Sequence, residues 1–314
     1  MKIFKLSLVF MMLFSSVVFA KQEKKNLIIF HAGSLAIPFA QMEKEFEKKY
    51  PEIDVKREAS GSRTAARKIS DLKRDCDVMA SADYSVIETL LIPAYADFNI
   101  SFAVNEMAIM YTEHSKYHNE INANNWYEIL LKPDVEYGHS DPNVDPCGYR
   151  AMLVWQLAEK HYKVNNLYNK LTDARPKKNI RPKETDLIAL LESGELDYLF
   201  IYKSVASQHK ELYLELPVEI SLRDNVYNDF YKQAKVEITG KTPGTFTTKK
   251  GQAMVYGITI PKTASNYEYA LKFVDFVLSK KGRKVMTENG QGVIVPAKSD
   301  QKNGVPKKLQ KYVK

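Results

Sequence analysis

The turn Ala32-Gly33-Ser34 most constrains the fold, because it joins two segments of different periodicity. Residues 27–30 before it are a continuous apolar run, typical of a buried strand. Residues 35–50 after it are apolar at every third or fourth position, which predicts an amphipathic helix. A strand therefore runs directly into a helix N-terminus, where unpaired N–H groups and the helix dipole can bind an anion.

Two further junctions repeat this pattern. Ser60-Gly61-Ser62 follows a short strand-like run and precedes a helical one. Asp145 followed by Pro146 is typical of a helix N-cap and first helical position, ahead of an apolar helix over residues 149–162. One alternative stays open, since Ser, Asp and Gly are also common at helix N-termini that only cap the helix.

Strand-like and helical segments alternate over the first hundred residues, which favours a mostly parallel sheet covered by helices. In such sheets ligands bind at the carboxyl ends of the strands, where the small-residue turns fall. The apolar stretch over residues 98–111 predicts a crossing into a second domain, and residues 254–260 predict the return. We therefore expect lobe I over residues 21–102 and 256–314 and lobe II over residues 103–255.

Three segments lack a strong pattern. Residues 163–182 are polar and contain proline and lysine, which predicts a linking loop, and the lysine-rich residues 298–314 predict a solvated tail. Cys76 and Cys147 could form one disulfide in an exported protein, but a chain of this size does not need one to build a core. We expect two free or buried thiols.

The N-terminus has the pattern of a secretory signal peptide over residues 1–20, with lysines, then an apolar run, then Ala20. An uncleaved membrane anchor is the alternative. Export predicts a periplasmic or other extracytoplasmic location. The formal charge of the whole chain is +8, and the leader holds two lysines, so the exported chain carries +6. Its lysines are scattered, which argues against nucleic acid as a partner.

Six motifs occur in an order that closely resembles the tungstate/molybdate-binding protein family, the extracytoplasmic receptors of an ABC importer. The resemblance extends over residues 26–296. The motifs are His31-Ala32-Gly33-Ser34-Leu35, Ala59-Ser60-Gly61-Ser62-Arg63, Asp77-Val78-Met79-Ala80-Ser81-Ala82-Asp83-Tyr84, Asp145-Pro146-Cys147-Gly148-Tyr149-Arg150, Arg181-Pro182-Lys183-Glu184-Thr185-Asp186-Leu187 and Asp197-Tyr198-Leu199-Phe200-Ile201-Tyr202-Lys203-Ser204-Val205-Ala206.

The resemblance implies a type II periplasmic-binding-protein fold, in which two α/β lobes with mixed, mostly parallel sheets are joined by crossing strands. It implies a monomeric, non-enzymatic receptor without a cofactor, whose partners are a tetrahedral oxyanion and a membrane permease. In that family the metal of the oxyanion is six-coordinate, with two ligands from protein carboxylates, which by motif match are Asp145 and Glu184. The other implied oxyanion-binding residues are Gly33, Ser34, Ser62, Pro146, Cys147 and Tyr202. Pro146 has no N–H, so the donor there would be Cys147.

Each residue also has a purely structural interpretation. The serines and Asp145 could be caps, Glu184 could complement a helix dipole, and Tyr202 could be a core strand residue. Two other functions are possible: a receptor for sulfate or phosphate, and an extracytoplasmic hydrolase that uses the paired carboxylates as acid and base. A sulfate or phosphate receptor would have hydrogen-bond donors at the positions of Asp145 and Glu184. A hydrolase would turn over a substrate.

Overall fold

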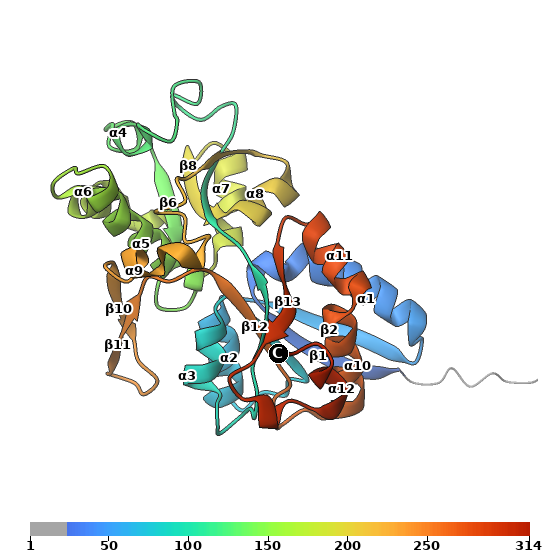
Figure 1. The fold of residues 1–314 in the computed structure, drawn as a ribbon. Helices are drawn as coiled ribbons and strands as arrows, with labels where there is room; N and C mark the ends of the chain where they lie inside the picture. The colour runs from blue at the N-terminus through green and yellow to red at the C-terminus, as the bar shows by residue number, and fades with distance from the viewer. Residues whose placement is uncertain (1–23) are drawn as a thin grey trace, which may run out of the picture.

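The computed structural model describes residues 24–314, which form two lobes (Figure 1). The predicted signal peptide, residues 1–20, lies outside the described residues. Within residues 24–314, no helix is both long enough and apolar enough to cross a bilayer.

The first sheet has six strands in the order β13-β4-β12-β3-β1-β2. The strands β1, β2 and β3 pair in parallel, whereas β12, β4 and β13 pair antiparallel to their neighbours. In chain order the strand bounds are β1 Lys25–His31, β2 Ile53–Ala59, β3 Val78–Ser81, β4 Ile100–Val104, β12 Val255–Thr259 and β13 Gly292–Lys298.

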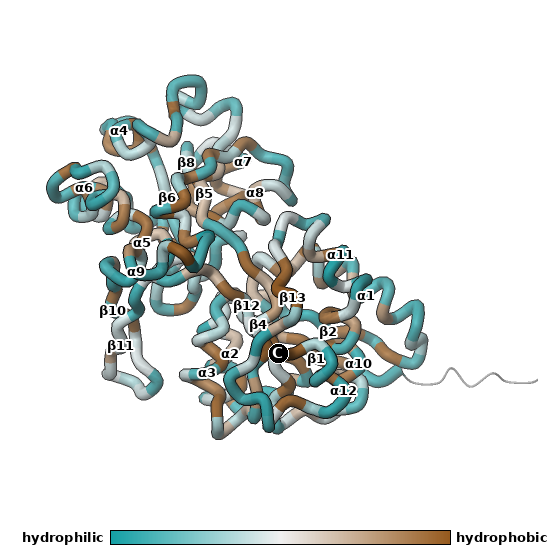
Figure 2. The backbone as a smooth tube through the Cα atoms, in the orientation of Figure 1, coloured by the Kyte–Doolittle hydropathy of each residue, from teal (hydrophilic) through white to brown (hydrophobic). Residues whose placement is uncertain are grey.

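Alternate residues of β1 serve the two faces of this sheet. Leu27 and Ile29 pack in the core cluster that holds α1 and α10, while Phe30 packs in the cluster that holds α2 and α3. The first sheet is thus covered by helices on both faces. Strands such as β12 and β13 contain hydrophobic segments (Figure 2). The helix bounds are α1 Ala36–Lys49, α2 Ser62–Ser70, α3 Tyr84–Leu90, α10 Tyr267–Leu278, α11 Lys280–Glu288 and α12 Lys307–Gln310.

The second sheet has the order β7-β6-β8-β5-β9, with β6 parallel to β7 and β8 and with β5 antiparallel to β8 and β9. Its core includes Trp155, Phe200 and Trp126, whose neighbouring rings pack edge to face. The strands are β5 Met107–Tyr111, β6 Tyr137–Ser140, β7 Ile180–Arg181, β8 Tyr198–Tyr202 and β9 Leu212–Glu215. The helices are α4 Trp126–Leu130, α5 Pro146–His161, α6 Leu167–Ala174, α7 Ile188–Glu192, α8 Lys203–His209 and α9 Asn228–Tyr231.

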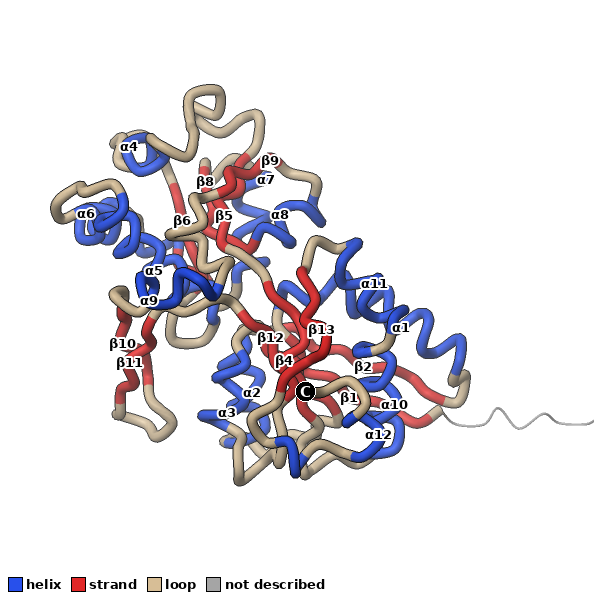
Figure 3. Tube along the Cα trace, in the orientation of Figure 1, coloured by secondary structure: helices blue, strands red, loops and turns tan. Residues whose placement is uncertain are grey.

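The chain passes between the two sheets at two places (Figure 3). The first is Asn105-Glu106, between β4 and β5, and the second is residues 251–254, before β12. A two-stranded hairpin, β10 Lys235–Thr239 and β11 Phe246–Lys250, precedes the second connection. The prediction of two α/β lobes with mixed sheets and crossing strands is confirmed, while the lobe limits at 102/103 and 255/256 stay a prediction. Contrary to the prediction, the sheets are not mostly parallel, because the strands next to the crossings, β4, β5 and β12, pair antiparallel to their neighbours.

Two predictions for the weakly patterned segments are wrong. Residues 163–182 are not only a loop, because they contain α6 and β7, and Leu167 and Leu171 of α6 are buried. The end of the chain is not a solvated tail, because Leu309 of α12 is buried and Val313 bridges to Ala297. In both segments a few apolar residues stand among lysines. The polar composition therefore obscures the pattern of a short amphipathic element.

The two cysteines are free and buried, as expected. Cys76 belongs to the core between the first sheet and α2 and α3. The Cys147 thiol lies 3.7 Å from the Phe200 carbonyl oxygen. Burial raises the pKa of each thiol, so both stay protonated and unreactive near neutral pH.

Two buried histidines give the fold a dependence on pH. Desolvation lowers the pKa of His31 to about 4 and that of His139 to about 3. The unfolded chain, with an ordinary histidine pKa near 6.5, therefore binds more protons between pH 6.5 and 4. Stability is complete above pH 6.5 and falls as the pH decreases, by about 2 kcal/mol per histidine at pH 5.

We expect His31→Asn to reduce the loss of unfolding free energy between pH 7 and pH 5, measured by urea denaturation. Asparagine keeps a side-chain donor for the Ala32 carbonyl, which lies 2.8 Å from Nδ1 of His31, but it does not titrate. The exposed His114→Gln variant is the control and should retain the full pH dependence. An unchanged dependence in His31→Asn would contradict the burial argument.

Candidate functional site

The first strand-to-helix turn lies against Glu184. Gly33 and Ser34 belong to a buried 3-10 turn that precedes α1, and Glu184 begins another short turn, Glu184–Leu187, ahead of α7. A Cβ atom on Gly33 would stand 3.0 Å from Oε1 of Glu184, so the missing side chain lets the carboxylate approach the backbone. The Glu184 carboxylate thus lies against the Gly33 turn of the other lobe.

Asp145 joins α5 to the Glu184 turn. It is the N-cap of α5, as predicted, and its Oδ1 accepts a hydrogen bond from the Cys147 N–H at 3.1 Å. Its Oδ2 accepts from the Glu184 N–H, also at 3.1 Å. Pro146 is the first residue of the helix and has no N–H. The Cys147 N–H, expected to face an anion, therefore donates to Asp145 in this structure.

The carboxyl groups of Asp145 and Glu184 are both buried and close to one another. Burial, and then the neighbouring Asp145 carboxylate, hold the pKa of Glu184 well above its ordinary value. Within residues 24–314, Oε2 of Glu184 is buried without a hydrogen-bond partner. Two desolvated acids this close together are favourable only when a proton or an electron-poor partner lies between them.

The second turn contacts the same acids from lobe I. A Cβ atom on Gly61 would lie 3.0 Å from Cβ of Asp145 and 2.4 Å from the Val144 carbonyl oxygen, so the backbone can approach here only as glycine. The N–H groups of Arg63 and Thr64, at the start of α2, donate to the Val144 carbonyl. Ser62 is buried and its Oγ accepts from the Ala82 N–H at 3.0 Å.

Tyr202 is the buried last residue of β8, and its hydroxyl contacts the Arg150 side chain. Nη1 of the buried Arg150 donates to the Tyr202 hydroxyl at 2.9 Å and to the Ala82 carbonyl at 2.8 Å. One guanidinium thus connects a lobe II tyrosine to a lobe I backbone group. Arg150 belongs to a matched motif, but its spacing gave no sign that it bridges the lobes.

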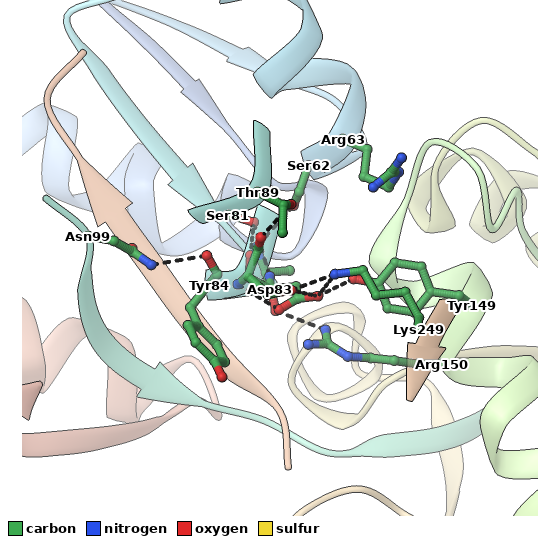
Figure 4. A network of polar contacts seen from close by, with 12 residues as sticks. Ser62, Arg63, Ser81, Asp83, Tyr84, Thr89, Asn99, Tyr149, Arg150 and Lys249 are labelled. Carbon is green, nitrogen blue, oxygen red and sulfur yellow. Dashed lines mark hydrogen bonds and ion pairs between the residues drawn. The ribbon is translucent and has the colours of Figure 1, made fainter. Parts of the chain in front are cut away.

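Asp83 is the centre of a second contact between the lobes (Figure 4). It caps α3 by accepting from the Ser85 N–H, and it accepts from the Tyr149 hydroxyl of lobe II. Nζ of Lys249, at the end of the hairpin, lies 3.3 Å from Oδ2 of Asp83. Burial opposes ionisation of Asp83, but the Lys249 and Arg150 charges hold its pKa below the ordinary value.

The structure therefore brings together Gly33, Ser34, Asp145, Glu184 and the start of α2 between the lobes. A cavity of about 440 Å³ lies elsewhere, between α11, β13 and the C-terminal residues. No predicted site residue lines this cavity. The residues that sequence reasoning missed are Asp83, Tyr149, Arg150 and Lys249. The sequence held one signal for Asp83 and Arg150, which is that each is a charged residue within a motif that matches the family.

Comparisons with known proteins identify the family of the chain. The family model described as bacterial extracellular solute-binding protein matches residues 27–291. An uncharacterized solute-binding protein of Petrotoga mobilis is 57% identical over 307 residues, covering 98% of this chain and 96% of the relative. The molybdate/tungstate-binding protein WtpA of Pyrococcus abyssi is 46% identical over 302 residues, covering 88% of this chain and 86% of the relative.

Solved structures show the fold. The periplasmic molybdate-binding protein of Azotobacter vinelandii matches with a TM-score of 0.59 at 15% identity, covering 84% of this chain and 98% of that one. The sulfate-binding protein SubI of Mycobacterium tuberculosis matches with a TM-score of 0.60 at 12% identity, covering 85% and 86%. The predicted periplasmic-binding-protein fold is confirmed. The chain belongs to the bacterial extracellular solute-binding protein family, and its resemblance to the tungstate/molybdate-binding proteins is confirmed.

Proposed function

We propose that this protein is an extracytoplasmic receptor that binds tungstate or molybdate between its two lobes and delivers it to an ABC permease. The carrying observation is the buried, unpartnered Oε2 of Glu184 beside the buried Asp145. The molybdate/tungstate-binding relatives from Pyrococcus abyssi and Thermococcus kodakarensis, at 46% and 45% identity, support the choice of ligand. The signal-peptide pattern over residues 1–20 supports export.

The two acids determine which oxyanion fits. Carboxylates beside a dianion repel it unless their oxygens reach an electron-poor centre. Hexavalent tungsten or molybdenum is a hard Lewis acid that accepts further oxygen ligands, so Asp145 and Glu184 would complete a six-coordinate metal. Each Asp145 oxygen accepts one N–H and keeps a second lone pair for this bond. The sulfur and phosphorus of sulfate and phosphate do not extend their coordination in this way, so the same acids would reject them.

Hydrogen-bond donors at the helix N-termini would stabilise the remaining negative charge of the oxyanion. Ser34 and the Gly33 backbone would contribute from lobe I, together with Ser62 at the start of α2. From lobe II, the Cys147 N–H at the start of α5 donates to Asp145 and would act through that carboxylate. The Tyr202 hydroxyl, which accepts from Arg150, would donate its own proton. This division of donors makes ligand binding and lobe closure one process. It needs no cofactor, no nucleic acid and no second copy of the chain, and it assigns the paired acids to binding instead of catalysis.

Calorimetric titration tests the ligand. We expect tungstate and molybdate to bind at least about 100-fold more tightly than sulfate and phosphate, a difference of about 2.7 kcal/mol. The reason is that only the first two supply a metal for the carboxylates. Tight binding of sulfate without tungstate would favour the rival oxyanion receptor and overturn the proposal.

Removing one carboxylate tests the coordination. Glu184→Gln and Asp145→Ala should each weaken tungstate binding by roughly 100-fold, whereas Ser62→Ala should weaken it by roughly tenfold, because Ser62 is one donor among several. The exposed Glu195→Gln variant is the control for charge. Equal losses for the acids and for Ser62 would count against metal coordination by the protein.

The Asp83–Lys249 contact tests lobe closure. Because it connects the lobes without lying among the proposed ligands, Lys249→Met should accelerate tungstate release about tenfold and change the association rate little, measured by stopped-flow fluorescence. Lys250→Met, at the next and exposed position of the hairpin, is the matched control. A slower association with unchanged release would show that Lys249 attracts the anion and does not hold the lobes.

A further inference from the structure

The Ser34 hydroxyl is held by a chain of polar side chains at the junction of the lobes. The Tyr256 hydroxyl lies 2.9 Å from Oγ of Ser34 and donates to it. Nδ2 of Asn105 donates to the Tyr256 hydroxyl, also at 2.9 Å. All three residues are buried. Asn105 lies in the first connection between the lobes and Tyr256 in β12, directly after the second.

The direction of these hydrogen bonds follows from Asn105. Its Oδ1 accepts from the Glu106 N–H at 3.0 Å and faces the Ser204 N–H at 3.4 Å. Its Nδ2 therefore points the other way and donates, to the Tyr256 hydroxyl and, at 2.7 Å, to Oγ of Ser204. An amide nitrogen accepts no hydrogen bond, so the Tyr256 proton is directed at Ser34.

Within residues 24–314, the Ser34 hydroxyl proton has no protein acceptor. The Oγ of Ser34 already accepts from Tyr256, and the Ser34 carbonyl accepts from Nε2 of Gln291 at 3.0 Å. Within the part of the chain that the structure describes, no side chain or carbonyl accepts from the Ser34 hydroxyl. A buried O–H with a free proton beside Glu184 is suited to an acceptor that arrives with the ligand.

We propose that Asn105 and Tyr256 are positioning residues that fix the Ser34 hydroxyl as a donor toward the bound oxyanion. This inference rests on the proposed function and defines its ligand class further. A fully deprotonated oxyanion offers only acceptors and satisfies the hydroxyl. An anion that presents its own O–H at this place meets a second donor and is disfavoured.

The chain also connects ligand binding to the arrangement of the lobes. Asn105 donates to Ser204, at the start of α8 in lobe II, and Tyr256 donates to Ser34 in lobe I. Gln291 spans the same two serines, because its Nε2 lies 3.0 Å from the Ser34 carbonyl oxygen and 3.3 Å from Oγ of Ser204. The Ser34 hydroxyl is thus directed only when both lobes hold these positions.

A double-mutant cycle tests the proposal. Tyr256→Phe removes one hydroxyl and keeps the ring packed against Phe102 and Tyr202. We expect it to weaken tungstate binding about tenfold, and we expect Ser34→Ala to do the same. The variant with both changes should bind no more weakly than Ser34→Ala alone, because Tyr256 acts through Ser34. Calorimetry gives the affinities and thermal unfolding shows whether each variant is folded.

Tyr231→Phe is the matched control, because Tyr231 is also buried and its hydroxyl donates to the Val218 carbonyl, away from the site. It should bind tungstate as the unmodified protein does. The proposal is overturned if Tyr256→Phe keeps full affinity, or if it costs the same in the presence and absence of Ser34. If the unmodified protein binds sulfate and not tungstate, the proposed function fails, and the same cycle titrated with sulfate decides on the positioning role.

Discussion

The structure depends on two buried carboxyl groups that belong to different turns and face one another. Asp145 is kept in place by the N–H groups of Cys147 and Glu184, and the Glu184 carboxylate lies against Gly33 of the other lobe. These contacts orient the acids but do not remove their mutual repulsion. A buried like-charge pair of this kind is costly unless a proton or an electron-poor centre lies between the groups. The same cost that disfavours the empty pair favours a ligand that supplies such a centre.

The backbone around the acids is arranged to allow this approach. Gly33 leaves room for the Glu184 carboxylate, and Gly61 leaves room for Asp145 and the Val144 carbonyl. A side chain at Gly61 would force the Val144 backbone away, whereas a side chain at Gly33 would press on the Glu184 carboxylate. Small residues in these turns therefore serve close packing between the lobes. Neither serine caps its helix with its side chain, because Ser34 accepts from Tyr256 and Ser62 from the Ala82 N–H, so the purely capping interpretation of the serines is wrong.

Much of the fold could be predicted from the sequence because its signals are local. The apolar runs of β1, β4, β5 and β8 and the Asp145-Pro146 start of α5 each lie within a few residues. The failures are also physical. The short helix α6 and the C-terminal α12 bury only one or two leucines, so lysines dominate their composition. The partly exposed β11 has no buried face to produce an alternating pattern.

The contacts at the junction of the lobes could not be predicted, because they join residues far apart in sequence. Lys249 meets Asp83 across 166 positions, and Tyr256 meets Ser34 across 222. Lysine is common on protein surfaces and tyrosine is common in strands. The sequence therefore does not distinguish Lys249 and Tyr256 from other residues of their types. Their role follows from where the two connections between the lobes bring the sheets together. Residues at these connections touch both the Gly33-Ser34 turn of lobe I and α8 of lobe II. If that turn binds the anion as proposed, they form the shortest path by which the anion and the position of the lobes can influence one another.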